Sequence, residues 1–376
     1  MELDTLAANT GVGYDCKGSI SVPIYQTATF QHPALNESTG FDYSRSGNPT
    51  RLVLEKGIAA LENGNIGLAY PSGMSAITNV FMFLGYNSHL IMTEDIYGGT
   101  YRLLNEILNQ YHIEATYVDT TNLQEITNAI QEDTAAIFIE SPTNPLLKVC
   151  DLKAIAQIAH QNNILLIVDN TFLTPYLQNP LQLGADIVIH SASKYLGGHN
   201  DLIAGLVAVK DQEIGDKLYF WQNSTGSILS PHESWLLLRG IKTLGIRMEK
   251  QQQNAVSLAR WLQNHPQVTR VYYPGLPDNP GYLLNLKQAR GYGAMISFEV
   301  RTPELIPRFL EHIELISFAE SLGGIETLVT FPYTQTHGDI NEETRNSLGI
   351  NNRLLRLSIG IEDQKDLIQD MEVALS

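Results

Sequence analysis

The stretch DIVIHSASKYLGGHND, residues 186–201, begins like a buried strand and ends on a lysine among small residues. Its apolar run is typical of a strand that is covered on both faces. Lys194 stands just after two serines and shortly before Gly197 and Gly198, which allow a tight backbone turn. A lone lysine at a strand end is ordinarily solvated. Whether Lys194 has a functional role must therefore be judged from the side chains that follow the neighbouring strands.

Short apolar runs recur over residues 65–210. They are IGLAY (66–70), HLIMT (89–93), IEATYV (113–118), AAIFIE (135–140), ILLIVD (164–169), DIVIH (186–190) and LIAGLVAV (202–209). Helical stretches are expected between most of them, at 73–84, 99–111, 122–131 and 151–161. This alternation predicts an α/β fold with a mostly parallel sheet covered on both faces. The last two runs lie too close together for a crossover helix, so a hairpin-like or irregular return is expected there.

The chain is expected to divide into three parts. Residues 1–50 lack hydrophobic periodicity, which predicts an irregular arm. Such an arm is expected to become ordered by packing against another part of the assembly, such as a second subunit. The α/β domain is expected over residues 51–240 and a smaller α+β domain over residues 241–376. A long helix is expected over residues 232–264, and strands at 294–300 and 354–362.

Composition narrows the class of protein. The 376 residues carry 24 Lys and Arg against 40 Asp and Glu, a net charge of −16, and no basic cluster indicates a nucleic-acid partner. Two cysteines, Cys16 and Cys150, favour a reducing cytoplasm over a disulfide scaffold. Neither a signal peptide nor a run of about 18 apolar residues is recognisable, so no membrane partner is expected.

Polar side chains follow several of the expected strands, at the edge where ligands bind in open α/β sheets. Each one alone could be a cap, a turn residue or packing. The residues at these strand ends are Gly73, Met74, Tyr97, Glu140, Asn144, Asp169, Thr171, Ser191, Ser193 and Lys194.

Together these residues meet the demands of pyridoxal 5′-phosphate. A lysine must bond the cofactor covalently, and Lys194 is available for that role. A carboxylate must pair with the ring nitrogen, and Asp169 lies on a neighbouring run. Backbone amides at a helix start suit the phosphate, and Gly73 and Met74 open such a helix. Tyr97 could supply an aromatic face for the ring. His190 and His199 lack partner ligands, so no metal is expected.

The sequence resembles the cysteine/methionine-metabolism family of pyridoxal-phosphate enzymes, which includes cystathionine γ-synthase and cystathionine γ-lyase. The resemblance covers nearly the whole chain. The matching stretches, in order, are YSRSGNPTR (43–51), SGMSA (72–76), YGGTYR (97–102), ESPTNP (140–145), VDNTF (168–172), HSASKYLGGHND (190–201), AESLGGIETL (319–328) and RLLRLSIGIE (353–362). It implies the type I fold of these enzymes, with a seven-stranded, mostly parallel sheet and a smaller C-terminal α+β domain.

The resemblance also implies residue roles. Lys194 would hold the cofactor and shuttle protons, which requires a lowered pKa, and Tyr97 and Tyr43 would assist in catalysis. The implied cofactor-binding residues are Lys194, Asp169, Gly73, Met74, Tyr97, Ser191, Ser193, Thr171, Tyr43 and Arg45. Arg356 would clamp the substrate α-carboxylate. Asn144, Ser321, Glu320 and Arg102 would complete the substrate site.

The family's assembly implies that Tyr43 and Arg45 reach the active site of a neighbouring subunit. That role explains the long N-terminal arm and makes at least a dimer necessary. A homotetramer built as a dimer of dimers is therefore expected.

The exact reaction is less sharply indicated. Gly99 stands where methionine γ-lyases carry a cysteine, and Glu320 is typical of members that act at the γ-carbon. Arg102 is either a partner for a distal substrate carboxylate or a solvated helix residue. We expect γ-replacement of an O-acylhomoserine by cysteine, as in cystathionine γ-synthase, or the sulfide reaction of O-acetylhomoserine sulfhydrylase. The alternatives are a cystathionine β- or γ-lyase and, remotely, a non-catalytic pyridoxal-phosphate-binding protein.

Overall fold

The computed structural model describes residues 1–338 and 342–376, which contain two β-sheets. The larger sheet has seven strands in the order β1-β7-β6-β5-β4-β2-β3. They are β1 (Ile66–Tyr70), β2 (Ser88–Thr93), β3 (Ile113–Val118), β4 (Thr134–Glu140), β5 (Leu165–Asp169), β6 (Ile187–Ser191) and β7 (Gly205–Val209). Strand β7 runs antiparallel to β1 and β6, and the other neighbours are parallel. The predicted mostly parallel sheet and its hairpin-like return are confirmed.

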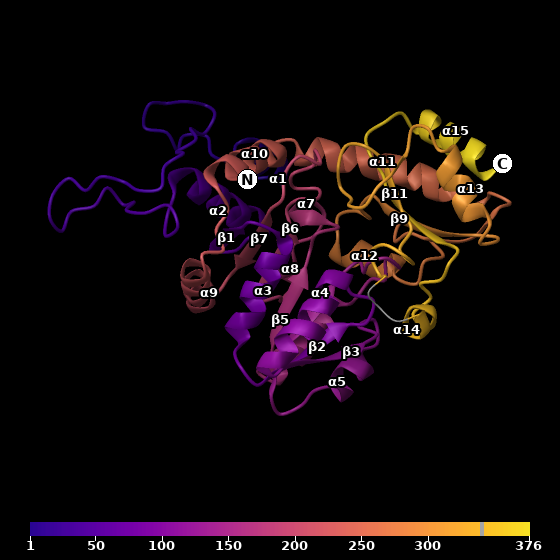
Figure 1. Ribbon diagram of the computed structural model, residues 1–376, viewed down its shortest axis with the longest axis horizontal. Coiled ribbons are helices and arrows are strands. Elements are labelled where there is room, and N and C mark those ends of the chain that lie inside the picture. Colours follow the sequence, from indigo (N-terminus) through magenta and orange to yellow (C-terminus); the bar gives the residue numbers. More distant parts are fainter. Residues whose placement is uncertain (339–341) are drawn as a thin grey trace.

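Helices cover both faces of this sheet (Figure 1). They are α2 (Pro49–Glu62), α3 (Gly73–Leu84), α4 (Gly98–Arg102), α5 (Leu123–Asn128), α6 (Leu152–Gln161), α7 (Thr174–Leu177), α8 (Pro180–Leu183), α9 (Gln212–Thr225) and α10 (Pro231–Ile241). On one face, Phe81 of α3 and Leu218 of α9 pack into one apolar core. On the other, Leu54 of α2, Ile155 of α6 and Leu237 of α10 pack into a second core. Burial on both faces explains why the strands are almost continuously apolar.

The smaller sheet has the order β10-β11-β12-β9-β8. Its strands are β8 (Val268–Tyr272), β9 (Met295–Val300), β10 (Ser317–Phe318), β11 (Leu328–Thr330) and β12 (Leu354–Ser358). The accompanying helices are α11 (Leu244–Gln263), α12 (Tyr282–Gln288), α13 (Leu305–His312), α14 (Glu342–Ser347) and α15 (Gln364–Leu375). Helix α11 runs from the large sheet towards the small one, so it joins the two parts (Figure 1).

Two predicted helices differ from the structure. The stretch 232–264 is not one helix, because α10 ends at Ile241 and α11 begins at Leu244. At this break the Arg247 guanidinium donates to the carbonyl of Gly240, near the end of α10, at 2.8 Å and to the carbonyl of Tyr195 at 2.7 Å. A side chain thus helps to satisfy one of the last carbonyls of α10. The stretch 99–111 is helical throughout but changes type, from α4 to a π-helical turn, η1 (Leu103–Ile107), and a 3₁₀ turn, η2 (Leu108–Tyr111). The sequence analysis did not predict helix α9 or strand β8.

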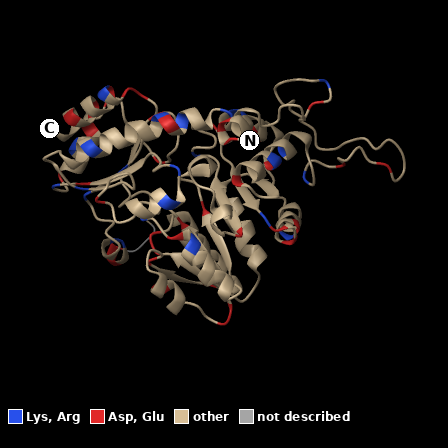
Figure 2. Ribbon diagram, turned by 180° about the vertical axis from the view of Figure 1, so that it is seen from behind, with Lys and Arg blue, Asp and Glu red and all other residues tan. Residues whose placement is uncertain are grey.

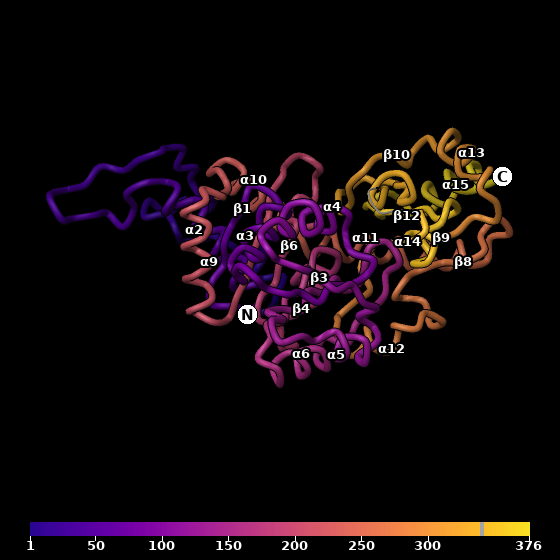
Figure 3. The backbone as a smooth tube through the Cα atoms, turned by 60° about the horizontal axis from the view of Figure 1, so that its bottom comes forward, coloured from indigo at the N-terminus to yellow at the C-terminus, as the bar shows by residue number. Residues whose placement is uncertain are grey.

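The N-terminal arm projects from the body (Figures 1 and 3). After the short α1 (Leu3–Ala8), the chain up to Asn48 contains one isolated β-bridge, between Thr29 and Tyr43, and no further helix or strand. Charged residues of both signs are spread over both sheet domains (Figure 2). Within residues 1–338 and 342–376 no helix combines the length and apolar character needed to cross a membrane.

Candidate active site

A cavity of about 800 Å³ opens at the carboxyl ends of β4, β5 and β6 and extends to the small sheet. Parallel strands bring their ends to one edge, so residues far apart in sequence meet there. Predicted site residues that line the cavity are Gly73, Met74, Tyr97, Asn144, Asp169, Thr171, Ser191, Ser193, Lys194, Glu320, Ser321 and Arg356.

Lys194 follows β6 and points into this cavity. Its Nζ donates a hydrogen bond to the Ser321 hydroxyl at 2.8 Å. Burial, and secondarily the positive charge of Arg356, lower the pKa of Lys194 to about 8, although Glu320 opposes the shift. A substantial fraction of the amine is therefore uncharged near neutral pH, as a nucleophile or proton acceptor requires.

Asp169 and Glu140 end neighbouring strands and are register partners of β5 and β4. The Thr171 N–H donates to Asp169 Oδ1 at 2.9 Å, and the Tyr97 N–H donates to Glu140 Oε1 at 3.1 Å. Burial raises the pKa of both carboxyls, and the charge of Asp169 raises that of Glu140 further. Because two like charges at this distance repel, ionisation of Asp169 disfavours ionisation of Glu140.

The start of α3 also lines the cavity, beside the end of β6. The Ser72 hydroxyl caps the helix by accepting from the Ser75 N–H at 3.0 Å. The N–H groups of Gly73 and Met74, in the first turn, have no partner within the helix and so suit an anion. A Cβ on Gly73 would lie 2.9 Å from the Ser191 Cβ, which explains the glycine.

Arg356 of β12 supplies a second positive charge. Its guanidinium donates to Asn144 Oδ1 (2.7 Å), the Ser321 carbonyl (3.2 Å) and the Thr330 hydroxyl (3.2 Å). Its buried Nε has no partner among the described residues. Burial lowers the pKa of Arg356 to about 10, so it remains a cation at neutral pH and can bind a carboxylate.

The comparison with protein families agrees with this geometry. The family described as Cys/Met metabolism PLP-dependent enzyme matches residues 4–376. The chain belongs to this family. It is therefore a pyridoxal-phosphate-dependent enzyme of α/β fold, as the sequence predicts.

Relatives of the chain in this family are named for different reactions. A cystathionine γ-lyase of Bacillus subtilis (strain 168) is 50% identical over 376 residues, which cover 100% of this chain and 99% of the relative. The cystathionine β-lyase MetC of the same organism is 47% identical over 358 residues, 95% of this chain and 92% of the relative. A solved structure of cystathionine γ-synthase from Xanthomonas oryzae pv. oryzae, in complex with aminoacrylate and cysteine, is 38% identical with a TM-score of 0.98, covering 100% and 98% of the two chains.

The residues of this family member fit pyridoxal phosphate on their own geometry. Lys194 is a buried amine of lowered pKa. Asp169 is a carboxylate at the end of the adjacent strand, and Gly73 and Met74 line the same cavity. These residues would hold the cofactor's aldehyde carbon, ring nitrogen and phosphate, respectively. The Ser193 hydroxyl, another predicted cofactor contact, accepts a hydrogen bond from the backbone N–H of Ala204 at 3.0 Å.

Tyr97 caps the cavity just before α4, and its ring is 43% exposed. A Cβ on Gly99 would approach the Tyr97 ring to 2.5 Å and the Met74 sulfur to 3.2 Å. With Tyr97 placed as it is, no larger side chain fits at position 99. This crowding gives a physical reason for the glycine at the position where methionine γ-lyases are expected to carry cysteine.

Three predicted site residues do not line the cavity of their own chain: Tyr43, Arg45 and Arg102. Tyr43 lies in the arm, and the Arg45 guanidinium sits 5.5 Å from its ring centre and donates to the Asn223 carbonyl at 2.8 Å. Arg102 is the last residue of α4. Their roles remain predictions.

The sequence analysis missed residues supplied by the small sheet and its loops. Thr336 and Glu326 line the cavity, and Thr330 bonds Arg356. His337 bonds the carbonyl of Asn144. The rule that ligands follow parallel strands does not reach this part of the chain. Glu326 lies in the matching stretch 319–328, and Thr336 and His337 lie in TQTHGDI (334–340), which resembles cystathionine γ-synthase and O-acetylhomoserine sulfhydrylase types, but the resemblance assigned no role to these three residues. Residues 339 and 340 of that stretch lie outside the described residues.

Proposed function

We propose that this enzyme cleaves cystathionine by elimination at the γ-carbon, so that cystathionine and water give cysteine, 2-oxobutyrate and ammonia. The carrying observation is the Glu320 carboxylate at the exposed rim of the cavity, close enough to Lys194 and Arg356 to influence both pKa values. Bound by one amino-acid end, cystathionine presents a second ammonium group, which Glu320 can pair with. The acyl group of an O-acylhomoserine offers no cation there.

The roles of the chain's own groups follow from their positions. Bound pyridoxal phosphate supplies the electron sink for the charge left at the substrate α-carbon. The Lys194 Nζ removes the α-proton and carries it onward, oriented by the Ser321 hydroxyl. Asp169 keeps the ring nitrogen protonated, and Arg356 binds the α-carboxylate with its unpartnered Nε. The full-length likeness to a cystathionine γ-lyase supports this direction.

The second candidate is γ-replacement, which the sequence patterns alone favour. In that reaction the incoming cysteine also carries an ammonium group, but the bound O-acylhomoserine itself presents none to Glu320. A side-by-side assay separates the two reactions. Cystathionine alone should yield 2-oxobutyrate; pyruvate instead would indicate β-elimination. Cystathionine formed only from an O-acylhomoserine plus cysteine would refute the proposal in favour of the synthase.

The variant Glu320→Gln tests the carrying observation, because it keeps the shape of the side chain and removes its charge. Its KM for cystathionine should rise about three- to tenfold, with a smaller change in kcat. Homoserine O-esters, which carry a leaving group on the γ-carbon but no second ammonium group, provide the matched control substrate. An equal change in KM for both substrates would refute the role of Glu320.

We also propose that the enzyme works in the cytoplasm as a homotetramer, a dimer of dimers in which Tyr43 and Arg45 complete the neighbour's cavity. The buried Arg51 supports this role, since it donates to the carbonyls of Ser44 (2.7 Å) and Arg45 (3.0 Å) and braces the segment from behind. Mixing inactive Arg45→Ala and Lys194→Ala proteins tests it. Recovered activity is expected, because a mixed dimer has one site with neither defect; no recovery after subunit exchange would refute the arrangement.

A further inference from the structure

The loop between β4 and α6, residues 141–151, carries Asn144 into the active site. The Asn144 Oδ1 accepts from Arg356 Nη1 at 2.7 Å, so the amide fixes one edge of the guanidinium. The loop contains no helix or strand that could set the position of Asn144. Its own hydrogen bonds, between Thr143 and Leu147 and between Thr143 and Lys148, bracket Asn144, and contacts from outside the loop complete its positioning.

One such contact comes from the other domain. The wholly buried His337 lies beside the loop, with Nε2 at 3.0 Å from the Asn144 carbonyl oxygen and Nδ1 at 2.9 Å from the Thr336 hydroxyl. A carbonyl oxygen only accepts, so Nε2 carries the proton. In the neutral ring, Nδ1 then accepts from Thr336. Burial, and secondarily the charge of Arg356, lower the pKa of His337 to about 3, which keeps the ring in this neutral form.

The His337 backbone is itself fixed. Its N–H donates to the Pro332 carbonyl at 3.1 Å, and its carbonyl accepts from Arg345 Nη1 at 3.3 Å. The Arg345 guanidinium lies 4.4 Å from the ring centre of Tyr333. These contacts fix the position of the His337 backbone, and with it the direction in which the imidazole N–H points.

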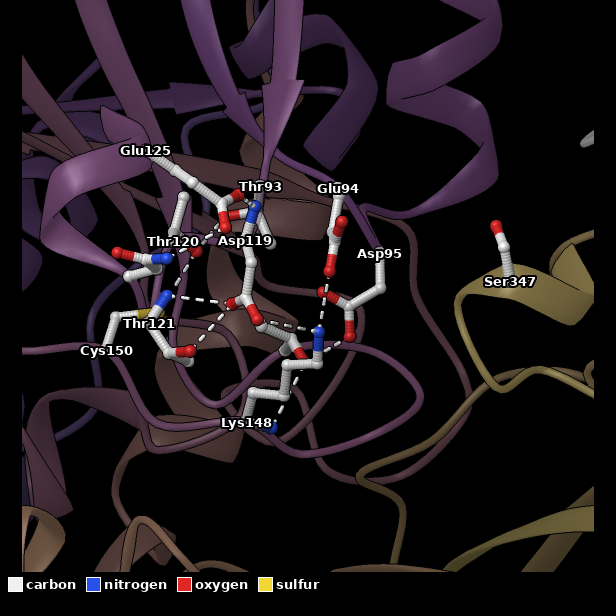
Figure 4. A network of polar contacts seen from close by, with 12 residues as sticks. Thr93, Glu94, Asp95, Asp119, Thr120, Thr121, Glu125, Lys148, Cys150 and Ser347 are labelled. Carbon is white, nitrogen blue, oxygen red and sulfur yellow. Dashed lines mark hydrogen bonds and ion pairs between the residues drawn. The ribbon is translucent and has the colours of Figure 1, made fainter. Parts of the chain in front are cut away.

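The loop is anchored independently on the large-sheet side. The Thr143 hydroxyl donates to the buried Asp95 at 2.6 Å. Lys148 Nζ lies 2.8 Å from Glu94 and 3.6 Å from Asp119 (Figure 4). Loss of the His337 contact should therefore shift Asn144 without releasing the whole loop.

We propose that His337 is a positioning residue for recognition of the substrate α-carboxylate. Through the Asn144 main chain it holds the Asn144 amide against Arg356, which leaves the Arg356 Nε free for the carboxylate. The inference rests on the proposed function, in which Arg356 is the carboxylate clamp. Because the two domains meet at this contact, it also couples the clamp to their relative position.

Glycine and methylamine are suitable probes, since they differ only in the carboxylate and both react with the cofactor through their amine. Holoenzyme is titrated with each amine, and binding is followed by the absorbance of the cofactor. His337→Leu should weaken apparent glycine affinity about tenfold and leave methylamine affinity within twofold. His337→Gln, whose amide can still donate to the Asn144 carbonyl, should retain glycine affinity within about threefold.

The control Arg356→Met separates failure of this inference from failure of the proposed function. It should abolish the preference for glycine over methylamine; if it does not, Arg356 is not the clamp and the proposed function fails. If Arg356→Met loses the preference but His337→Leu keeps it, the positioning role is refuted. Equal weakening of both probes by His337→Leu also refutes it. Should His337→Leu not fold, His337→Asn, whose shorter amide cannot reach Asn144, takes its place with the same expected outcomes.

Discussion

The lowered pKa of Lys194 leads to a quantitative prediction for capture of the cofactor by apoenzyme. Only the uncharged amine attacks the aldehyde. With a pKa of about 8, roughly one molecule in ten carries the neutral amine at pH 7. An ordinary lysine of pKa about 10.5 would be neutral in roughly one molecule in 3,000. The buried site therefore makes Lys194 about 300-fold more available at neutral pH.

The assay is stopped-flow mixing of apoenzyme with pyridoxal phosphate between pH 6 and pH 10, monitored at the absorbance band of the bound cofactor. The rate should rise with pH and level off above a midpoint near 8. Arg356→Met removes the secondary cause of the shift but not burial, so its midpoint should move upward while staying below 10.5. Glu320→Gln removes an opposing charge and should move it downward.

The ring nitrogen and phosphate of the free cofactor also titrate, so the control is the same pH series with butylamine in place of protein. Divided by the neutral fraction of butylamine at each pH, that series gives the pH dependence that belongs to the cofactor. A protein midpoint near 10.5 after this correction would refute the argument from burial. Shifts of the two variants in directions opposite to those stated would refute the assignment of charges.

Three further predictions concern single side chains. Lys194→Ala should abolish turnover, measured as 2-oxobutyrate release, while the circular dichroism spectrum is retained; residual activity above about 1% would remove Lys194 from its role. Gly73→Ala should weaken cofactor binding at least tenfold in equilibrium dialysis, because the added methyl meets Ser191 at 2.9 Å; unchanged affinity would contradict the close approach. Glu62→Ala should lower the free energy of unfolding by about 3–5 kcal/mol in urea titration, because it strips the buried His190 of its 2.7 Å partner; a loss below about 1 kcal/mol would show that the pair is not structural.

The large sheet could be predicted from sequence because its signal is local. Each strand is a short run such as residues 187–189, buried on both faces, and the chemistry follows immediately at its end. Lys194 and Asp169 could thus be found without coordinates. Lys194 and Ser321, in contrast, meet across 127 positions of sequence, and no pattern sets that distance.

The break between α10 and α11 was unpredictable for a related reason. The apolar spacing is unbroken from Ile241 to Leu244, so the pattern predicts one helix. The end of α10 is instead marked by hydrogen bonds from Arg247, a buried arginine of the following helix. Its hydrogen bonds to Gly240 and Tyr195 exist only after tertiary packing. Local periodicity therefore reports which face is buried but not where a helix is interrupted.

The charge distribution shows why overall composition was a poor guide to the ligand. A net charge of −16 argues against anionic partners at long range, yet the proposed site has to bind the cofactor's phosphate and a substrate carboxylate. Charges farther apart than about 8–10 Å are screened by physiological salt, so the nearest groups decide. Here the nearest positive or anion-binding groups are Lys194, Arg356 and the amides at the start of α3, while burial and then the charge of Asp169 raise the pKa of Glu140. Anion recognition by this enzyme is therefore a property of the few buried groups at the strand ends, and substitutions on its acidic surface should leave it unchanged.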